Sequence, residues 1–229
     1  MQPYIFPYIG YFQLIHAVDT FVFYDDVQFI KKGFINRNSI LVNGTSFQFT
    51  IPCKSISQNK LIKDTELAFT EKAKVTFLKT IQHAYQKAPF FDKVFPLIES
   101  FIVNDTSQSI SELAIDSVKC ITNYLNIQKQ WRISSQNHDD SKLLKKEIRL
   151  IQIAKHEKAL TYINSIGGFD LYDKEDFEEH DIHINFIKPK QIIYKQFNNI
   201  FVPGLSIIDV IMFNSIEDIE SLINQFELV

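Results

Sequence analysis

Short apolar runs alternate along this chain with longer segments whose apolar residues recur at helical spacing. The run from Phe21 to Tyr24 ends at two aspartates, as expected of a strand buried on both faces whose carboxyl end meets a polar edge. Strands are predicted in this way at residues 20–25, 131–134, 160–164 and 182–187. Because strands that alternate with helices favour an α/β fold, we predict one mostly parallel, Rossmann-like sheet with helices on both faces, and ligands beyond the carboxyl ends of its strands.

Local signals define the segments between these strands. Asn43-Gly44 between two β-rich arms predicts a type I′ hairpin, inserted at about 36–52. Apolar residues at helical spacing predict a helical segment at about 71–126, in which Ser109 and Glu112 have the spacing of a capping box. A charged helix is predicted around residues 144–151, with Leu144, Ile148 and Ile151 on one face. Two more helices are predicted around residues 205–214 and 216–226.

The composition of the 229 residues favours one compact domain. With 45% hydrophobic residues the chain can bury a substantial core, and its two cysteines lack the spacing of a disulfide framework or a zinc site. A net charge of −3 argues against a nucleic-acid partner. No apolar run reaches the roughly 18 residues of a membrane helix, and the first residues do not resemble a secretion signal. We therefore expect a single domain over 1–229, located in the cytoplasm, with no membrane span; the oligomeric state stays open.

The first residues have the composition of a rigid turn. Residues 2–12 contain two prolines, three tyrosines and Gly10, ahead of a predicted helix, and a turn that leads into a helix N-terminus suits an anion. Residues 7–11 resemble the Pro-His-Ile-Gly-His turn of nucleotidyl-transferring enzymes, with Tyr8 and Tyr11 at the two histidine positions. A phenol can donate a hydrogen bond to phosphate but carries no positive charge. The alternative is an aromatic plug that only packs.

Two acidic residues and an arginine follow the first predicted strand. Adjacent residues on a strand point to opposite faces, so one carboxylate of Asp25 and Asp26 should face a given cleft, and we choose Asp26. It could bind magnesium, a ribose or an amine, or act as a base. Arg37, between Asn36 and Asn38, offers a planar fork to a carboxylate or phosphate. The alternative for Arg37 is a salt bridge to Asp25 or Asp26.

A second polar loop follows the strand predicted at 131–134. The hydroxyls and amides of Ser134 and Ser135 could hold phosphate oxygens, and Tyr172 could line the same crevice. Ser206 and Asp209 could equally cap the last helices. The six histidines lack HExxH spacing, and GxSxG, Walker A and GxGxxG motifs are absent, so no metal ligands are predicted. One shared pocket is expected to be lined by Tyr8, Tyr11, Asp26, Arg37 and Ser134.

Motifs along nearly the whole chain resemble one bacterial family. They are Met1-Gln2-Pro3-Tyr4, Pro7 to Phe12, Tyr24 to Phe29, Asn36 to Asn38, Tyr85 with Ala88-Pro89, Ser134-Ser135, Gly167-Gly168, Leu171 to Asp173, and Leu205 to Asp209 with Phe213-Asn214. Together they are similar to the WbqC-like protein family. Similar proteins usually carry a short apolar stretch before the Met-Gln-Pro-Tyr element, so we expect a first strand to be missing at the N-terminus.

The resemblance implies an enzyme of surface-polysaccharide (O-antigen, lipopolysaccharide) biosynthesis that attaches an amino acid or acyl group to an amino sugar through an amide bond. Its substrate would be a nucleotide-linked amino sugar. Our residue hypothesis adds ATP with magnesium and an adenylate intermediate. The expected catalytic residues are Asp26, Arg37 and Tyr11. The expected binding residues are Gln2, Tyr4, Tyr8, Gly10, Asp25, Gln28, Asn36, Asn38, Ser134, Ser135 and Tyr172. Two alternatives stay open: an ATP-independent acyl transferase with a carrier protein or thioester donor, and a non-catalytic sugar- or partner-binding protein.

Overall fold

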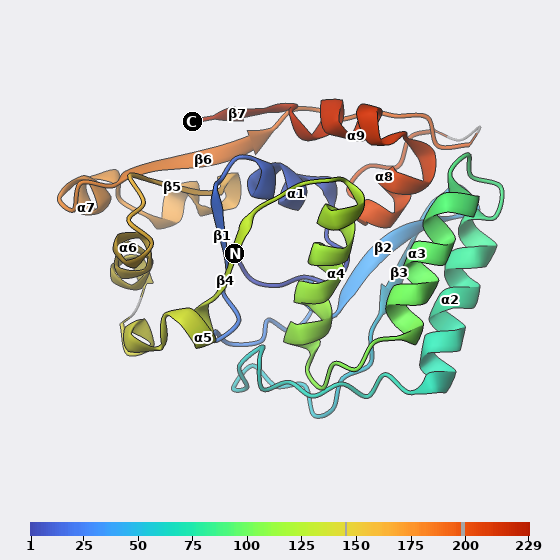
Figure 1. The fold of residues 1–229 in the computed structure, drawn as a ribbon, viewed down its shortest axis with the longest axis horizontal. Coiled ribbons are helices and arrows are strands. Elements are labelled where there is room, and N and C mark those ends of the chain that lie inside the picture. The colour runs from blue at the N-terminus through green and yellow to red at the C-terminus, as the bar shows by residue number, and fades with distance from the viewer. Residues whose placement is uncertain (145, 198–199) are drawn as a thin grey trace.

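The computed structural model describes residues 1–144, 146–197 and 200–229 (Figure 1). The helices are α1 (Ile9–His16), α2 (Glu71–Tyr85), α3 (Phe91–Val103), α4 (Ile110–Tyr124), α5 (Ser134–Asn137), α6 (Lys146–His156), α7 (Lys174–Glu178), α8 (Ile207–Phe213) and α9 (Ile216–Ile223). The strands are β1 (Thr20–Phe23), β2 (Arg37–Val42), β3 (Thr45–Thr50), β4 (Gln130–Ile133), β5 (Thr161–Ser165), β6 (His183–Pro189) and β7 (Phe226–Leu228). Short 3₁₀ helices occupy Asp139–Ser141 and Ile166–Leu171.

The fold is mixed α/β, and its strands form small separate sheets with both parallel and antiparallel pairs. β1 pairs with β4 in parallel, β2 pairs with β3 antiparallel, and β6 lies between parallel β5 and antiparallel β7. The four strands expected in one parallel sheet all exist, but within the described residues they form two parallel pairs with no ladder between the pairs. The prediction of a single Rossmann-like sheet was wrong in this respect. Helix α1 contacts both β5 and β6, so helical packing covers part of the surface of that sheet.

Aromatic side chains hold the β1–β4 pair together. In its register Phe21 lies opposite Trp131 and Phe23 opposite Ile133. The Trp131 ring stacks on Phe23 at 5.4 Å and meets Phe21 edge-on at 5.9 Å between centroids. Pairs of aromatic rings at these distances stabilise the contact beyond the area that they bury. Because Phe23 and Ile133 are the last residues of their strands, both strands end at the same level.

The hairpin is confirmed in detail. Asn43 and Gly44 both have positive φ, 50° and 77°, as the two central residues of a type I′ turn require. β2 and β3 then pair in register from Val42 and Thr45 back to Arg37 and Thr50. On the right of Figure 1 the hairpin lies beside α2 and α3, and these two helices pack against each other.

The predicted helical segment and its cap are also confirmed. Three helices, α2, α3 and α4, occupy it, and the capping box at the start of α4 is formed by Ser109 and Glu112. These helices join α1, α8, α9 and the hairpin in one large hydrophobic core, while Ile151, Phe177 and Phe186 belong to a smaller core between α6, α7 and the β5–β6 pair. No helix in the described parts of the chain has both the length and the apolar composition that a membrane span needs.

The first residue of the chain lies along β1. The amino group of Met1 donates to the carbonyl of Val22 at 2.8 Å, and the Met1 carbonyl accepts from the amide of Tyr24 at the same distance. These two bonds run along the free edge of β1, opposite to its β4 edge. The segment 2–8 then leads from this edge to α1.

Candidate functional site

The carboxyl ends of β1 and β4 bring two polar segments together: the acidic pair after β1 and the serine pair after β4. Because the two strands are parallel and end level with each other, Asp25 and Asp26 meet Ser134 and Ser135 although more than a hundred residues separate them. This is the place where parallel strands generally present ligand-binding groups. We call Asp25, Asp26, Ser134 and Arg149 the carboxylate cluster.

Asp25 is buried and held by hydrogen bonds from the serines. Its Oδ1 accepts from the Ser135 amide at 3.0 Å and lies 3.1 Å from the Ser134 hydroxyl, and its Oδ2 accepts from the Ser135 hydroxyl at 2.7 Å. The amide of Asp25 donates to the Ser134 oxygen at 3.2 Å. Within the described residues Asp25 has no cation at salt-bridge distance, so its charge is stabilised by neutral donors.

Asp26 instead forms a buried ion pair. Its Oδ2 lies 2.5 Å from Nη2 of Arg149, and the two side chains are only 6% and 5% exposed. Its Oδ1 lies 2.5 Å from the same Ser134 hydroxyl that contacts Asp25. The expectation that Asp25 and Asp26 face opposite sides was therefore wrong. β1 ends at Phe23, so the alternation of a strand no longer applies to the two aspartates.

Arg149 is the member of the carboxylate cluster that the sequence did not predict. It projects from α6 with its guanidinium 4.7 Å from the centre of the Tyr24 ring, and its Nε donates to the Ser141 hydroxyl at 3.3 Å. A guanidinium over an aromatic face is an attractive arrangement that also fixes its orientation. The only sequence signal was an arginine within the predicted helix at 144–151, which gives no indication of its partner.

A small polar cleft opens beside the carboxylate cluster. Its volume is about 220 Å³. Six of the residues that line it are Asp25, Ser135, Lys63, Lys119, Asp116 and Ser111. The Ser111 hydroxyl is buried and has no hydrogen-bond partner in the described chain, and burial raises the pKa of the Asp116 carboxyl. A cleft with this lining suits a small hydroxylated or amine-bearing group rather than an apolar ring.

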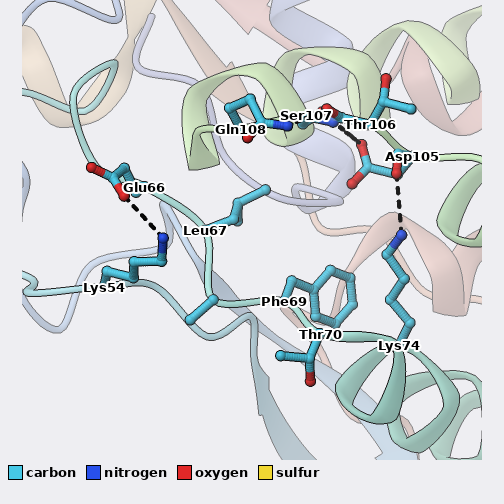
Figure 2. Close-up of a pocket in the computed structure, with 11 residues that line it drawn as sticks. Lys54, Glu66, Leu67, Phe69, Thr70, Lys74, Asp105, Thr106, Ser107 and Gln108 are labelled. Carbon is cyan, nitrogen blue, oxygen red and sulfur yellow. Dashed lines mark hydrogen bonds and ion pairs between the residues drawn. The ribbon is translucent and has the colours of Figure 1, made fainter.

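A second, larger cavity of about 430 Å³ lies elsewhere, between the loop before α2 and the loop before α4 (Figure 2). None of the residues expected in the site lines it. Its two lysines are already paired: Lys54 with Glu66 at 3.1 Å, and Lys74 with the Asp105 carbonyl at 3.1 Å. Size alone favours this cavity, but we place the candidate site at the smaller cleft because the buried carboxylates lie there.

The N-terminal tyrosines form an aromatic group of their own. The Tyr11 ring is 1% exposed, its hydroxyl donates to the Gln2 carbonyl at 2.9 Å, and its centroid lies 5.8 Å from that of Tyr4. Tyr8 is more exposed and folds over Gly10, where a Cβ atom would lie 2.3 Å from the Tyr8 ring. For Tyr11 this arrangement matches the packing alternative, because its hydroxyl already has a backbone partner.

Arg37 and its two asparagines bind backbone carbonyls. Arg37 Nε donates to Gly33 O at 2.8 Å, and its Nη2 contacts the Lys32 carbonyl. Asn36 Nδ2 donates to Ile51 O at 2.9 Å, and Asn38 Nδ2 to the Phe6 carbonyl at 2.7 Å. The alternative of a salt bridge from Arg37 to either aspartate was wrong: Arg149 is the cation at Asp26. Arg37 as a ligand-binding residue stays a prediction.

Two other expected binding residues lie on different elements. Gln28 is exposed and forms an isolated bridge with Leu61. Tyr172 follows the second 3₁₀ helix, where its ring meets Phe177 at 6.2 Å and approaches Gly168, whose Cβ position would lie 3.1 Å from it. The structure therefore brings Asp25, Asp26, Ser134 and Ser135 together directly. That Tyr8, Tyr11 and Arg37 share this pocket stays a prediction.

A further buried carboxylate lies on α8. Ser206 caps this helix as expected, accepting from the Ile208 amide at 3.3 Å. Asp209 does not close a capping box. It is fully buried and accepts from the hydroxyls of Tyr85 at 2.8 Å and Tyr194 at 2.6 Å. Burial raises the pKa of the Asp209 carboxyl, although these hydrogen bonds act in the opposite direction. Since the Tyr85 oxygen also accepts from the Leu41 amide, Asp209 links α8 to α2 and the hairpin.

Comparison with known proteins agrees with the motifs. The model of the WbqC-like protein family matches residues 2–221. The chain belongs to this family. A relative from Mycobacterium tuberculosis (strain ATCC 25618 / H37Rv), the uncharacterized protein Rv1507c, is 27% identical over 208 residues, which cover 90% of this chain and 88% of that protein. No solved structure matches the chain.

Proposed function

We propose that this WbqC-like protein forms an amide bond between an acyl or aminoacyl group and an amino sugar, in the biosynthesis of a surface polysaccharide such as O-antigen. The buried aspartate pair beside the small polar cleft supports this most. An amino group reaches the reaction as an ammonium and must lose protons as it attacks an acyl carbon. A carboxylate in the cleft can bind the ammonium and accept such a proton. The polysaccharide setting rests on the family resemblance.

In this proposal the two aspartates have different roles. Asp25 lines the cleft and has no ion-pair partner among the described residues, so we assign it to the amine. Asp26 is neutralised by Arg149 and positions the Ser134 hydroxyl. The ammonium bound to Asp25 first loses one proton to solvent, which frees the lone pair of the nitrogen. This lone pair forms the new C–N bond while the bond from the acyl carbon to its leaving group breaks. Asp25 accepts the second proton from the nitrogen and passes it to the departing group, which for a thioester leaves as the thiol. This assignment moves the base from Asp26, our choice from the sequence, to its neighbour.

The dimensions and contacts of the site favour one of the two donor classes. The cleft of about 220 Å³ is smaller than the roughly 300–1,000 Å³ of pockets that enclose drug-sized ligands. It therefore suits the sugar unit of the substrate, with the attached nucleotide outside the cleft, and leaves no room for ATP beside that sugar. The hydroxyls of Ser134 and Ser135, which an ATP mechanism would place on phosphates, are bonded to carboxylates. We therefore favour acyl transfer from a thioester or carrier protein over activation by ATP with magnesium.

Product analysis by mass spectrometry tests the proposal. The protein is incubated with a nucleotide-linked amino sugar and either an acyl thioester without ATP, or the free acid with ATP and magnesium. We expect an N-acyl sugar from the thioester, and a loss of about 100-fold or more in rate for Asp25→Asn, as for removal of a general base. The control is Asp92→Asn, which changes an exposed carboxylate on α3.

Each other outcome overturns a stated part of the proposal. A product that forms only with ATP refutes the thioester donor and restores the adenylate hypothesis. An amino sugar that raises the melting temperature without any product identifies a sugar-binding protein and refutes catalysis. If Asp25→Asn and Asp92→Asn have equal rates, Asp25 is not the base.

A further inference from the structure

Two histidines and a glutamate meet where the segment after α5 packs against the end of α6. His138 follows α5, while His156 and Glu157 lie at the end of α6. Glu157 Oε1 is 3.2 Å from His138 Nε2 and 4.0 Å from His156 Nδ1. One ligand atom from each of the three residues lies within 4.8 Å of the other two. The histidine spacing along the chain predicts no metal site, because these residues are brought together only by the packing of α6 on the segment after α5.

His138 provides an independent observation. Its side chain is 1% exposed, and neither ring nitrogen makes a hydrogen bond within the described residues. Nε2 is close to Glu157 Oε1, but the two atoms are not aligned as donor and acceptor. Buried polar nitrogens are rarely left without a partner in folded proteins. An ion between Nε2 and the carboxylate would satisfy both groups without requiring an N–H to point at the oxygen.

We propose that His138, His156 and Glu157 form a binding site for a divalent transition-metal ion such as Zn²⁺. Two imidazoles and one carboxylate are ligands that zinc and its neighbours prefer, whereas magnesium and calcium prefer oxygen ligands alone. A tetrahedral ion with bonds of roughly 2.0–2.1 Å holds its ligand atoms about 3.3–3.4 Å apart. The separation between His138 and Glu157 already matches this value, and His156, which is 54% exposed, is free to rotate inward.

The surroundings of the three residues bear on affinity in both directions. Burial lowers the pKa of the His138 imidazole, in the direction of the neutral form that ligates metal ions. Arg132 Nε donates to the same Glu157 oxygen at 3.1 Å, and its positive charge disfavours a cation. The same hydrogen bond also fixes the orientation of the carboxylate, as outer partners of metal ligands commonly do.

The position of the site suggests what the ion would do. His138 is separated by one turn from Ser134, and His156 lies on the same helix as Arg149. An ion on these ligands would therefore connect the ends of α5 and α6, the two helices that supply Ser134 and Arg149 to the carboxylate cluster. The proposed metal site does not depend on the proposed function, because its occupancy can be measured without any substrate.

Calorimetric titration of the chelator-treated full chain with ZnCl₂, together with thermal melting, tests the site. We expect one Zn²⁺ per chain, a higher melting temperature with Zn²⁺, and no such shift with Mg²⁺. His156→Ala should weaken Zn²⁺ binding more than tenfold while the fold is kept, because His156 is half exposed. Glu157→Gln should weaken binding as well. The matched control is His83→Ala, which removes an exposed histidine from the last turn of α2, as His156→Ala does from α6.

Two outcomes of the Zn²⁺ titration would contradict the proposed metal site. If the parent protein binds no Zn²⁺, the site does not exist. If His156→Ala and Glu157→Gln both bind Zn²⁺ as the parent does, the ion sits on other surface groups. His138→Ala is a third variant, but its buried position makes loss of the fold a separate effect, so the decision rests on the two more accessible ligands.

Discussion

Removing Arg149 should leave a buried carboxylate without its cation, and the size of the effect follows from the structure. Both partners of the Asp26–Arg149 pair are almost fully buried, and removing one partner of a buried pair destabilises proteins by about 3–5 kcal/mol. Arg149→Met keeps much of the side-chain volume, so the change is mainly electrostatic. We expect the free energy of unfolding, measured by urea denaturation, to fall by an amount in this range. Repulsion from nearby Asp25 adds to the effect.

A double-mutant cycle separates the pair from other contacts of Arg149. Asp26→Asn alone should cost less, because Arg149 keeps its contacts with Tyr24 and Ser141. In the variant with both changes no unpaired charge is left, so the two losses should not add; coupling energies of contacting residues are about 0.5–3 kcal/mol.

An exposed ion pair provides the control for this cycle. Lys190 lies 3.5 Å from Glu227 with both side chains more than half exposed, so Lys190→Met should cost less than about 1 kcal/mol. If Arg149→Met costs no more than Lys190→Met, or if the losses at Asp26 and Arg149 simply add, the buried pair does not exist in solution.

Three further changes test other parts of the structure. Burial raises the pKa of the Asp209 carboxyl in the folded state. The protonated carboxyl should therefore contribute fully to stability below the unfolded-state pKa, and this contribution should decline as pH rises through the folded-state pKa. Urea midpoints from pH 3 to 7 should show the decline in the parent protein and not in Asp209→Asn. Gly44→Ala should lower the free energy of unfolding by about 1–2 kcal/mol, since φ is 77°; an unchanged urea midpoint would contradict the I′ turn. Arg37→Lys should cost about 0.5–1.5 kcal/mol for each hydrogen bond lost to the carbonyls. If Arg37 binds a ligand carboxylate or phosphate, the same change should also reduce the ligand-induced melting shift, and an unchanged shift would refute that role.

Elements with strong local signals could be predicted from the sequence. The hairpin has its Asn-Gly turn, α4 has its capping box, and the apolar runs identify β1, β4, β5 and β6. Which strands pair is not a local property, because each strand offers hydrogen-bonding groups on two edges. The number and order of the sheets therefore differed from the prediction although the strands themselves were found.

The candidate site was predictable on one side only. Asp25, Asp26, Ser134 and Ser135 could be found because each pair directly follows an apolar run, and strand ends are where parallel pairs present polar groups. Arg149 could not, because helical periodicity favoured Leu144, Ile148 and Ile151 as the inner face. In the structure Ile148 is 58% exposed, and the inner face of α6 combines Arg149 with Ile151. In the sequence, a buried arginine looks like a surface residue until its carboxylate partner is known. A search for this kind of site should therefore begin from acidic residues at strand ends and ask which cation the fold brings to them.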